Sequence, residues 1–324
     1  MEDILLLSNL PEYFKLMTGE YLYNLTIDKI PCLVDPIFPK TGVVALVGSS
    51  DTGKSTILRQ LSIAIVTGKE TFLEEFSIAA DHRSVIYVST EDDLMATAHN
   101  LRKQAKNHIS DGSDLKGLRF IFNDTDDYLK EIKNKLEESP ADCVIIDAFT
   151  DIFSGELNAS TKVRAQINEF DKLASKYKTL IIFLHHTGKR TDKYAPSKDN
   201  ILGSQGFEAK MRCVLELRVD SKEADNRHLC IVKGNYISSE NKSKSYVLKF
   251  NDDLNFAYTN KRVPLEAIKN LKNTSEFEEK KQKAILLAKK LKNEGLTYEI
   301  ITKKLHEQGY LFSKSAINNW LTKK

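Results

Sequence analysis

The sequence predicts an α/β fold with a mostly parallel central sheet, antiparallel strands at one edge and a small all-α module at the C-terminus. Short apolar runs rich in β-forming residues alternate with amphipathic helical stretches over the first half of the chain. This alternation is typical of a parallel sheet with helices on both faces. The end of the chain contains only helical patterns, which are stopped by glycine or opened by serine.

Length and charge limit the organisation of the chain. With 324 residues the chain can form one large α/β core and a small appendage. From Lys261 onward there are 15 Lys and Arg against 7 Asp and Glu, a net +8, which leaves −5 for the first 260 residues (33 minus 38). The basic excess is therefore C-terminal, and we expect that segment to meet an acidic partner.

The cysteines and the apolar runs predict a cytoplasmic protein. Cys32, Cys143, Cys213 and Cys230 are far apart in sequence and form no C-x-x-C pair, which is typical of buried thiols in a reducing compartment. An acidic residue stands near the N-terminus, where a secretory signal needs basic ones. No run approaches the roughly 20 apolar residues of a membrane span, so we expect no membrane partner.

The predicted elements follow in chain order. Residues 1–40 lead in with an apolar start and a proline-containing stretch, which predicts an irregular path to the first core strand. Apolar runs then predict core strands at residues 42–48, 84–89, 118–122, 142–147 and 179–185. Helical patterns separate them at residues 93–109 and 160–178. Polar turns too short for crossover helices join three later runs, which predicts antiparallel strands at residues 212–218, 228–234 and 244–250.

A Gly-rich loop connects the first core strand to its helix, in the segment GSSDTGKST at residues 48–56. The spacing fits the pattern G-x-x-x-x-G-K-[ST]. In that pattern backbone N–H groups face inward, the helix start offers its positive dipole end, and the lysine adds a point charge. The predicted nucleotide-binding residues are Gly48, Ser49, Ser50, Asp51, Thr52, Gly53, Lys54, Ser55 and Thr56.

Carboxylates follow two of the other core strands. The run ADCVIIDAF places Asp147 at the end of one strand, where it would hold Mg²⁺ together with Ser55. The run VIYVSTEDD ends in Glu91, Asp92 and Asp93. Phosphate hydrolysis needs an acceptor for the attacking water, and we assign this role to Glu91. Asp92 and Asp93 can instead cap the following helix.

A histidine pair and a long polar loop come next. His185 and His186 end the strand LIIFLHH, and neighbours in a strand point to opposite faces, which argues against a shared metal and favours a γ-phosphate sensor on one of them. The polar stretch 187–206 is long for a loop in a compact domain. It is either a solvated loop or a phosphate-backbone contact, through Lys189, Arg190, Lys193 and Lys198.

The C-terminal end predicts a helix-turn-helix module. Two amphipathic patterns stop at Gly295 and Gly309, and a third begins at a serine. Such modules bind either DNA or other proteins. For DNA binding, the residues suited to face a groove are Lys314, Ser315, Asn318 and Asn319.

Four motifs in one order, GSSDTGKST, STEDD, VIIDAF and FLHHTGK, resemble the RecA-fold ATPases of the RepA type, the hexameric replicative helicases of plasmids and mobile elements. The resemblance covers roughly residues 25–250 and includes the later segment VKGNY. It implies a RecA-like P-loop ATPase core that uses ATP and Mg²⁺, and a homo-oligomeric ring with ATP between neighbouring subunits. The helix-turn-helix module lies outside it.

The resemblance also implies roles for individual residues. Lys54 and Ser55 would take the nucleotide and Mg²⁺, Glu91 would be the general base, Asp147 the Walker B acid and His186 the sensor. The segment GSQGFEAKMRC, residues 203–213, matches the part of the family that carries an arginine finger, and Arg212 falls on it. Lys233 of VKGNY resembles a second interface residue. A plain ion pair is the other interpretation of Arg212.

These features predict a domain order and a function. We expect an N-terminal oligomerisation segment at residues 1–25, a RecA-like ATPase domain at 26–260, a linker at 261–278 and a helix-turn-helix module at 279–324. The leading hypothesis is an ATP-hydrolysing motor that acts on DNA, a hexameric helicase or mobilisation ATPase. The alternatives are a nucleotide-switched DNA-binding regulator without unwinding activity and, third, a RadA-like or KaiC-like ATPase.

Overall fold

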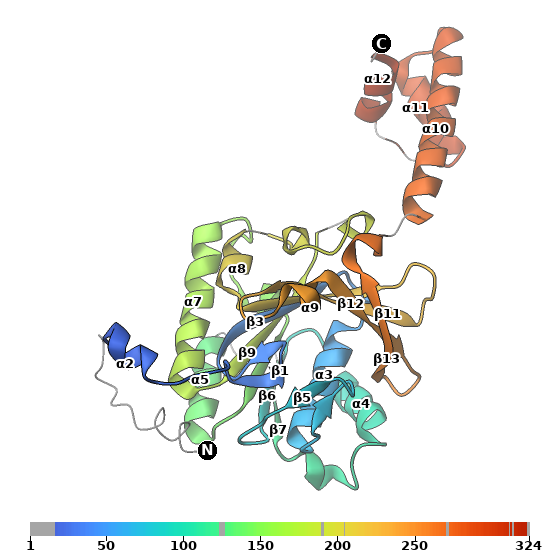
Figure 1. Ribbon diagram of the computed structural model, residues 1–324. Coiled ribbons are helices and arrows are strands. Elements are labelled where there is room, and N and C mark those ends of the chain that lie inside the picture. The colour runs from blue at the N-terminus through green and yellow to red at the C-terminus, as the bar shows by residue number, and fades with distance from the viewer. Residues whose placement is uncertain are drawn as a thin grey trace.

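A nine-stranded sheet forms the centre of the protein (Figure 1). The computed structural model describes residues 17–122, 127–188, 191–203, 205–269, 272–310, 312 and 314–322. The strands of the sheet are β3 (Gly42–Gly48), β6 (Val85–Ser89), β7 (Leu118–Ile121), β8 (Cys143–Asp147), β9 (Leu180–His186), β10 (Cys213–Val219), β11 (Asn226–Gly234), β12 (Lys244–Phe250) and β13 (Phe256–Pro264). Their spatial order is β13-β12-β11-β10-β3-β9-β8-β6-β7.

The prediction of a mostly parallel sheet is confirmed, with one correction. β3, β6, β7, β8 and β9 pair in parallel, and β11, β12 and β13 continue the sheet in antiparallel fashion. β10, which we predicted to be antiparallel, pairs with β3 in parallel. The segment between β9 and β10 is long enough to cross back over the sheet and contains a helix, so the chain re-enters from the same end.

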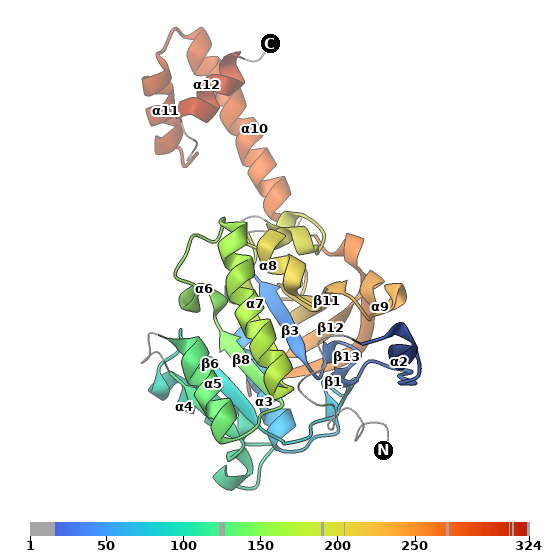
Figure 2. The same cartoon turned by 90° about the vertical axis from the view of Figure 1, so that its left-hand side faces the viewer.

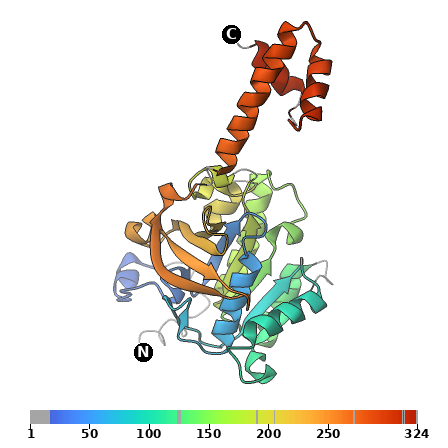
Figure 3. The same cartoon turned by 90° about the vertical axis from the view of Figure 1, so that its right-hand side faces the viewer.

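Helices cover both faces of the sheet (Figures 2 and 3). On one face lie α3 (Lys54–Val66) and α4 (Leu94–Ala105), and on the other lie α5 (Tyr128–Glu138), α7 (Ser160–Tyr177) and α8 (Gln205–Lys210). Strand β3 shows why both are needed, because Val44 and Leu46 enter the first core while Val43, Ala45 and Val47 enter the second. Shorter helices are α2 (Gly19–Tyr23), α6 (Phe149–Ile152), α9 (Ser239–Ser243), η1 (Gly112–Leu115), η2 (Thr191–Lys193), η3 (Lys198–Asn200) and η4 (Leu265–Ala267).

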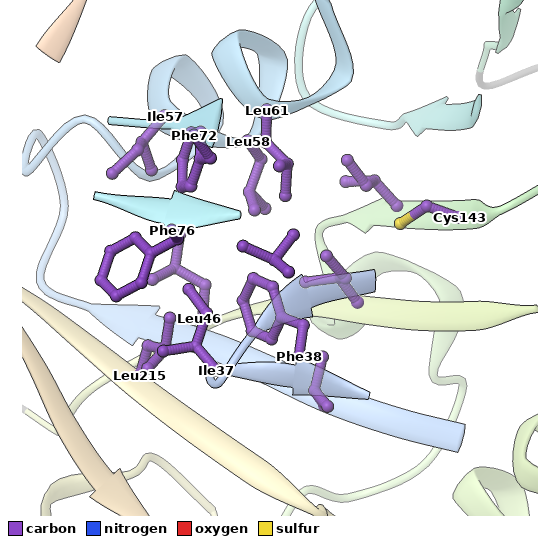
Figure 4. Close-up of a cluster of buried hydrophobic side chains, with 14 of the residues drawn as sticks. Ile37, Phe38, Leu46, Ile57, Leu58, Leu61, Phe72, Phe76, Cys143 and Leu215 are labelled. Carbon is purple, nitrogen blue, oxygen red and sulfur yellow. The ribbon is translucent and has the colours of Figure 1, made fainter. Parts of the chain in front are cut away.

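A second, small sheet covers the α3 face and was not predicted. It contains β1 (Cys32–Asp35), β2 (Phe38–Pro39), β4 (Thr71–Phe72) and β5 (Phe76–Ile78) in the order β2-β1-β5-β4. Figure 4 shows Phe38, Phe72 and Phe76 meeting side chains of α3 and of the large sheet in one buried cluster. The stretch that we expected to be an irregular lead-in to β3 therefore contributes strands and core residues.

The C-terminal segment forms three helices that stand away from the sheet in the views of Figures 1 and 3. They are α10 (Lys272–Asn293), α11 (Tyr298–Glu307) and α12 (Lys314–Thr322). β13 continues to Pro264 and α10 begins at Lys272, so regular structure enters both ends of the range 261–278 that we predicted to be a linker. No helix in the described part of the chain is long and apolar enough to cross a lipid bilayer.

Candidate nucleotide-binding site

The Gly-rich loop joins β3 to α3 and holds the side chain of its own lysine. Lys54 is buried, and its Nζ donates a hydrogen bond of 2.7 Å to the carbonyl oxygen of Ser49, while Thr52 Oγ1 donates to the same oxygen at 3.0 Å. Burial lowers the pKa of Lys54, and the carboxylates of Asp147, Glu91 and Asp51 oppose this shift. The ammonium charge therefore lies within the loop, at the start of α3.

Two glycines of the loop are needed for steric reasons. A Cβ on Gly48 would lie 2.5 Å from the carbonyl oxygen of Leu217, so β10 can approach β3 only where the side chain is absent. Gly53 has φ +93, and its Cβ would lie 2.7 Å from the ring of Phe256. The same loop that fits a phosphate is thus in close contact with the strands that extend the sheet.

Asp147 ends β8 and is the buried carboxylate of the site. Tyr87 on the adjacent strand β6 donates a hydrogen bond of 2.7 Å from its hydroxyl to Asp147 Oδ2. Asp147 Oδ1 is buried and has no hydrogen-bond partner within the described residues. Burial raises the pKa of Asp147 to about 6, although hydrogen bonds from Tyr87 and Ser55 pull it down.

These groups fit a magnesium ion that is bound together with a nucleotide. Mg²⁺ in nucleotide sites keeps several waters and takes only one or two protein oxygens. Asp147 offers an unsatisfied oxygen, and Ser55, close enough to hydrogen-bond Asp147, offers a hydroxyl. Among the described residues no group of three or more His, Cys, Asp or Glu side chains could hold a metal by itself.

The turn after β6 separates the roles of its three acidic residues. Asp93 is the N-cap of α4 and accepts from the backbone N–H of Ala96, and Asp92 lies 3.5 Å from Arg59 of α3. Glu91 is half exposed, and its Oε1 lies 3.7 Å from His186 Nε2. Structural contacts therefore occupy Asp92 and Asp93, whereas Glu91 faces the site.

The histidine pair divides between the core and the site. His185 is buried against the rings of Phe149 and Phe207, and its Nε2 lies 2.9 Å from the carbonyl oxygen of Leu202. Burial lowers its pKa to about 4, so the ring is neutral and donates this hydrogen bond. His186 points to the opposite side, toward Glu91.

A pocket of about 560 Å³ brings together eight of the predicted residues and adds four that sequence reasoning missed, while the buried Asp147 lies outside its lining. It is lined by Ser50, Asp51, Gly53, Lys54, Ser55, Thr56, Glu91, Leu184, His186, Arg227, Phe250 and Phe256. Arg227 Nε donates to the carbonyl oxygen of Thr52 at 3.0 Å. The Arg227 guanidinium lies 5.9 Å from the Phe250 ring, and the Phe250 and Phe256 rings are 4.9 Å apart. No motif marks these residues, because the antiparallel strands carry them back to the loop.

Arg212 and Lys233 lie near the amino-terminal ends of the parallel strands β3 and β10, whereas the pocket lies at the carboxyl ends. Arg212 comes directly before β10 and lies beside the start of β3. The Gly-rich loop follows the other end of β3, about 20 Å away, since each strand residue rises about 3.3 Å. Its Nη1 donates to the hydroxyl of Tyr236 at 2.9 Å. No carboxylate within the described residues pairs with Arg212, whereas Lys233 Nζ lies 3.1 Å from Glu208 Oε1.

The polar loop after β9 folds back onto the Gly-rich loop. Ser49 Oγ donates to Asp192 Oδ1 at 3.1 Å. Of the four predicted DNA contacts here, Lys189 and Arg190 lie outside the described residues, Lys193 is half-buried, and Lys198 lies 3.6 Å from Glu208. This part of the loop is therefore folded against the body of the protein.

The three C-terminal helices share a core of their own. Ala284, Ala288, Ile301, Leu305 and Ile317 are buried in it, and Trp320 and Leu321 pack against it. Asn318 and Asn319 are exposed on α12. The other two predicted DNA contacts, Lys314 and Ser315, also lie in α12, but their side chains are outside the described set.

Comparison with known proteins gives two findings. Residues 19–192 match a family model described as an AAA domain. The fold is similar to a solved structure described as an ATPase domain, with a TM-score of 0.56 and 12% sequence identity over 79% of this chain and 98% of that chain. No curated protein matches the sequence.

Proposed function

The chain belongs to the AAA domain family, and from that premise we propose that it is an ATP-hydrolysing motor with a RecA-like core. One observation carries the proposal. Lys54, Ser55, Asp147, Glu91 and His186 come from four separate segments of the chain, and all of them meet at the carboxyl ends of neighbouring parallel strands. Ligands bind at that edge of open α/β sheets.

We assign the roles of these residues as follows. Lys54 and the N–H groups at the start of α3 bind the β- and γ-phosphates, and Ser55 and Asp147 hold Mg²⁺, which supplies charge neutralisation when bound. Glu91 accepts a proton from the attacking water. His186 is the γ-phosphate sensor, since it lies beside Glu91 and faces the same pocket.

Arg227, Phe250 and Phe256 form one wall of the pocket, beside Thr52 and Gly53 of the loop. A flat guanidinium and aromatic rings suit a nucleobase, because stacking needs planar partners and little else. We therefore assign the nucleobase to this wall, which the sequence alone did not indicate.

Arg212 supports a ring in which subunits share sites. It lies at the edge of the sheet opposite its own pocket and has no carboxylate partner in the part of the chain that the structure describes. An arginine so placed is too far from the γ-phosphate position of its own pocket, and in a ring we assign it to the γ-phosphate of a neighbouring subunit, where such a residue contributes about 10³ to 10⁵ in rate. We propose a homo-oligomeric, hexameric ring with Arg212 as the finger and Lys233 beside it.

We further propose that the motor is of the RepA type and acts on DNA in a plasmid or mobile element. The supporting features are the motif order and the exposed Asn318 and Asn319 on α12 of the helix-turn-helix module at 279–324. In this proposal residues 26–260 form the motor, and the C-terminal helices deliver it to a duplex site.

The first experiment is steady-state ATP hydrolysis by the wild type and Lys54→Ala, alone and with single-stranded DNA, duplex DNA or RNA. A salt concentration of about 0.1 M damps non-specific attraction to phosphates. We expect hydrolysis that single strands stimulate and that Lys54→Ala abolishes. Hydrolysis indifferent to single strands would favour the nucleotide-switched regulator, and no hydrolysis under any condition would refute the proposal.

Mixed oligomers test the shared site. Arg212→Ala protein should bind ATP and hydrolyse little of it, and mixing it with Lys54→Ala protein should restore part of the activity, because an intact Lys54 and an intact Arg212 then meet at some interfaces. Normal assembly without any recovery would count against an arginine that acts on its neighbour.

A further inference from the structure

Thr90, the residue before Glu91, ties the ends of two strands together. Its backbone N–H donates to the carbonyl oxygen of Asp147 at 2.8 Å. Its hydroxyl oxygen accepts from the N–H of Ala148 at 2.9 Å and lies 2.5 Å from Asp151 Oδ2. The backbone of Thr90 is therefore bound to the last residue of β8, and its side chain to the segment that follows β8.

The hydroxyl group of Thr90 donates its hydrogen to the carboxylate of Asp151. A threonine hydroxyl has one hydrogen to donate, and two oxygens are within reach, Asp151 Oδ2 at 2.5 Å and the Asp147 carbonyl oxygen at 2.8 Å. The carboxylate is charged and nearer, and the carbonyl already accepts the N–H of Thr90. Asp151 lies on α6, the short helix directly after Asp147.

Glu91 itself has few side-chain restraints. It is half exposed, and within the described residues the one group that pairs with it is His186, at 3.7 Å. The position of its carboxylate therefore depends on where the backbone holds it. That backbone is fixed one residue earlier, at Thr90, and one residue later Asp92 is held by Arg59.

We propose that Thr90 is a positioning residue, which together with Asp151 holds Glu91 in register with Asp147. The proposal rests on the proposed ATPase function and assigns a role that none of the motifs indicates. Thr90 is not among the residues that line the pocket. It acts through the peptide that it shares with Glu91, so its loss affects the rate of hydrolysis and not the binding of nucleotide.

The test compares Thr90→Val, Thr90→Ser and Asp151→Ala in the full-length protein. Valine keeps the shape and removes the hydroxyl, whereas serine keeps the hydroxyl. We expect Thr90→Val and Asp151→Ala each to lower kcat by about 10- to 100-fold, with the affinity for a fluorescent ATP analogue within about twofold of wild type. Thr90→Ser should recover most of the rate, and the double variant Thr90→Val/Asp151→Ala should be no slower than either single variant.

Thr150→Val is the matched control, because Thr150 Oγ1 donates to the other oxygen of the same carboxylate, at 3.3 Å, and Thr150 lies on α6 with Asp151. It should keep the wild-type kcat. A wild-type kcat in Thr90→Val would overturn the proposal, as would a parallel loss of rate, affinity and melting temperature that serine does not rescue.

Hydrogen exchange separates this proposal from the ATPase assignment. Thr90→Val and Asp151→Ala should each speed exchange in peptides spanning residues 88–95, and Thr150→Val should not, whether or not the protein hydrolyses ATP. Unchanged exchange in the first two variants would overturn the positioning role alone. Absent hydrolysis in the wild type, with the exchange pattern as expected, would refute the ATPase alone.

Discussion

Asp147 shows how a residue can serve a site at the expense of the fold. Its carboxylate is buried beside Tyr87 and has one oxygen without a partner within the described residues. Burial raises its pKa from 3.8 to about 6, so the native state binds a proton there more tightly than the unfolded state. The stabilising contribution of this group is fully present below pH 3.8 and is lost as the pH rises through about 6.

Asp147→Asn should therefore stabilise the protein without nucleotide at pH 8 and abolish hydrolysis. The amide keeps an acceptor for the Tyr87 hydroxyl and carries no charge to bury. A pKa difference of about 2 units corresponds to roughly 2–3 kcal/mol, which sets the upper limit of the gain. Urea denaturation at pH 8 and at pH 5 measures it, and the gain should shrink at the lower pH.

Asp93→Asn is the control for this substitution. Asp93 caps α4 from an exposed position, and asparagine caps a helix about as well as aspartate. Its stability should stay within about 0.5 kcal/mol of wild type at both pH values. A loss of stability in Asp147→Asn at pH 8 would contradict the account of Asp147.

The two neighbouring histidines should respond oppositely to the same substitution. His185→Phe removes the donor to the Leu202 carbonyl oxygen inside an aromatic cluster, and we expect a loss of about 1–3 kcal/mol in the free energy of unfolding. His186→Phe, on a side chain that is 26% exposed at the rim of the pocket, should change stability little and lower the hydrolysis rate. Denaturant titration and ATPase assays on both variants test this prediction. Equal losses of stability would contradict the assignment of His185 to the core and His186 to the site.

At the scale of elements, the loop at residues 191–203 is held by a buried ion pair on β10. Arg218 Nε lies 2.6 Å from Glu216 Oε1, and both side chains are almost fully buried. Arg218 also donates to the carbonyl oxygen of Tyr194, and Glu216 accepts from the backbone N–H of Ser197. Burying these two charges would by itself destabilise the fold, but both side chains also hydrogen-bond to backbone groups of the loop.

Arg218→Met should destabilise the protein by about 3–5 kcal/mol, because it leaves the Glu216 charge buried without a partner. The double variant Glu216→Leu/Arg218→Met removes both charges and should recover part of that loss. Urea unfolding measures the free energies. In both variants limited proteolysis should cut more readily within residues 191–203, and a double variant less stable than Arg218→Met would contradict this view.

The sequence predicted those elements whose signal is local. β3, β8 and β9 are apolar runs because both faces of each strand are buried, and the side chains that end them, such as Asp147 and His186, were correctly placed at one edge of the sheet. Strands of two to four residues, as in the small sheet, carry no measurable periodicity. β13 has mostly exposed or half-exposed residues, and its last four, residues 261–264, were assigned to the predicted linker.

The missed part of the site has the same explanation. Arg227, Phe250 and Phe256 carry no pattern of their own, and only the pairing of three antiparallel strands brings them beside Gly53 and Thr52. A local motif can predict which residues bind phosphate, because one loop supplies them. It cannot predict a wall that depends on strand order.

At the scale of the whole molecule, the sheet and the C-terminal helices have separate hydrophobic cores. Among the residues whose side chains the structure describes, the helical core contains six that are buried, against more than fifty in the two cores of the sheet. The single tryptophan of the chain, Trp320, packs against the helical core, with its ring centroid 4.9 Å from that of Phe312. Tryptophan emission therefore reports on these helices alone.

Urea unfolding should accordingly show two transitions. Trp320 emission should change at a lower urea concentration than far-UV circular dichroism, which the sheet and its helices dominate, because a smaller core supplies less hydrophobic stabilisation. ATP with Mg²⁺ should shift only the circular dichroism transition. Coincident transitions that nucleotide shifts together would mean that the two parts unfold as one unit.

The contact between Gly53 and Phe256 limits where the chain can be shortened. The AAA domain match stops at residue 192, and a gene fragment ending there would encode Lys54, Glu91, Asp147 and His186. Such a fragment would lack β10 to β13, so β3 would become an unpaired edge strand of the sheet. One side of the nucleotide pocket would then be open to solvent. The shortest expression clone that keeps the pocket closed therefore extends through β13, to Pro264.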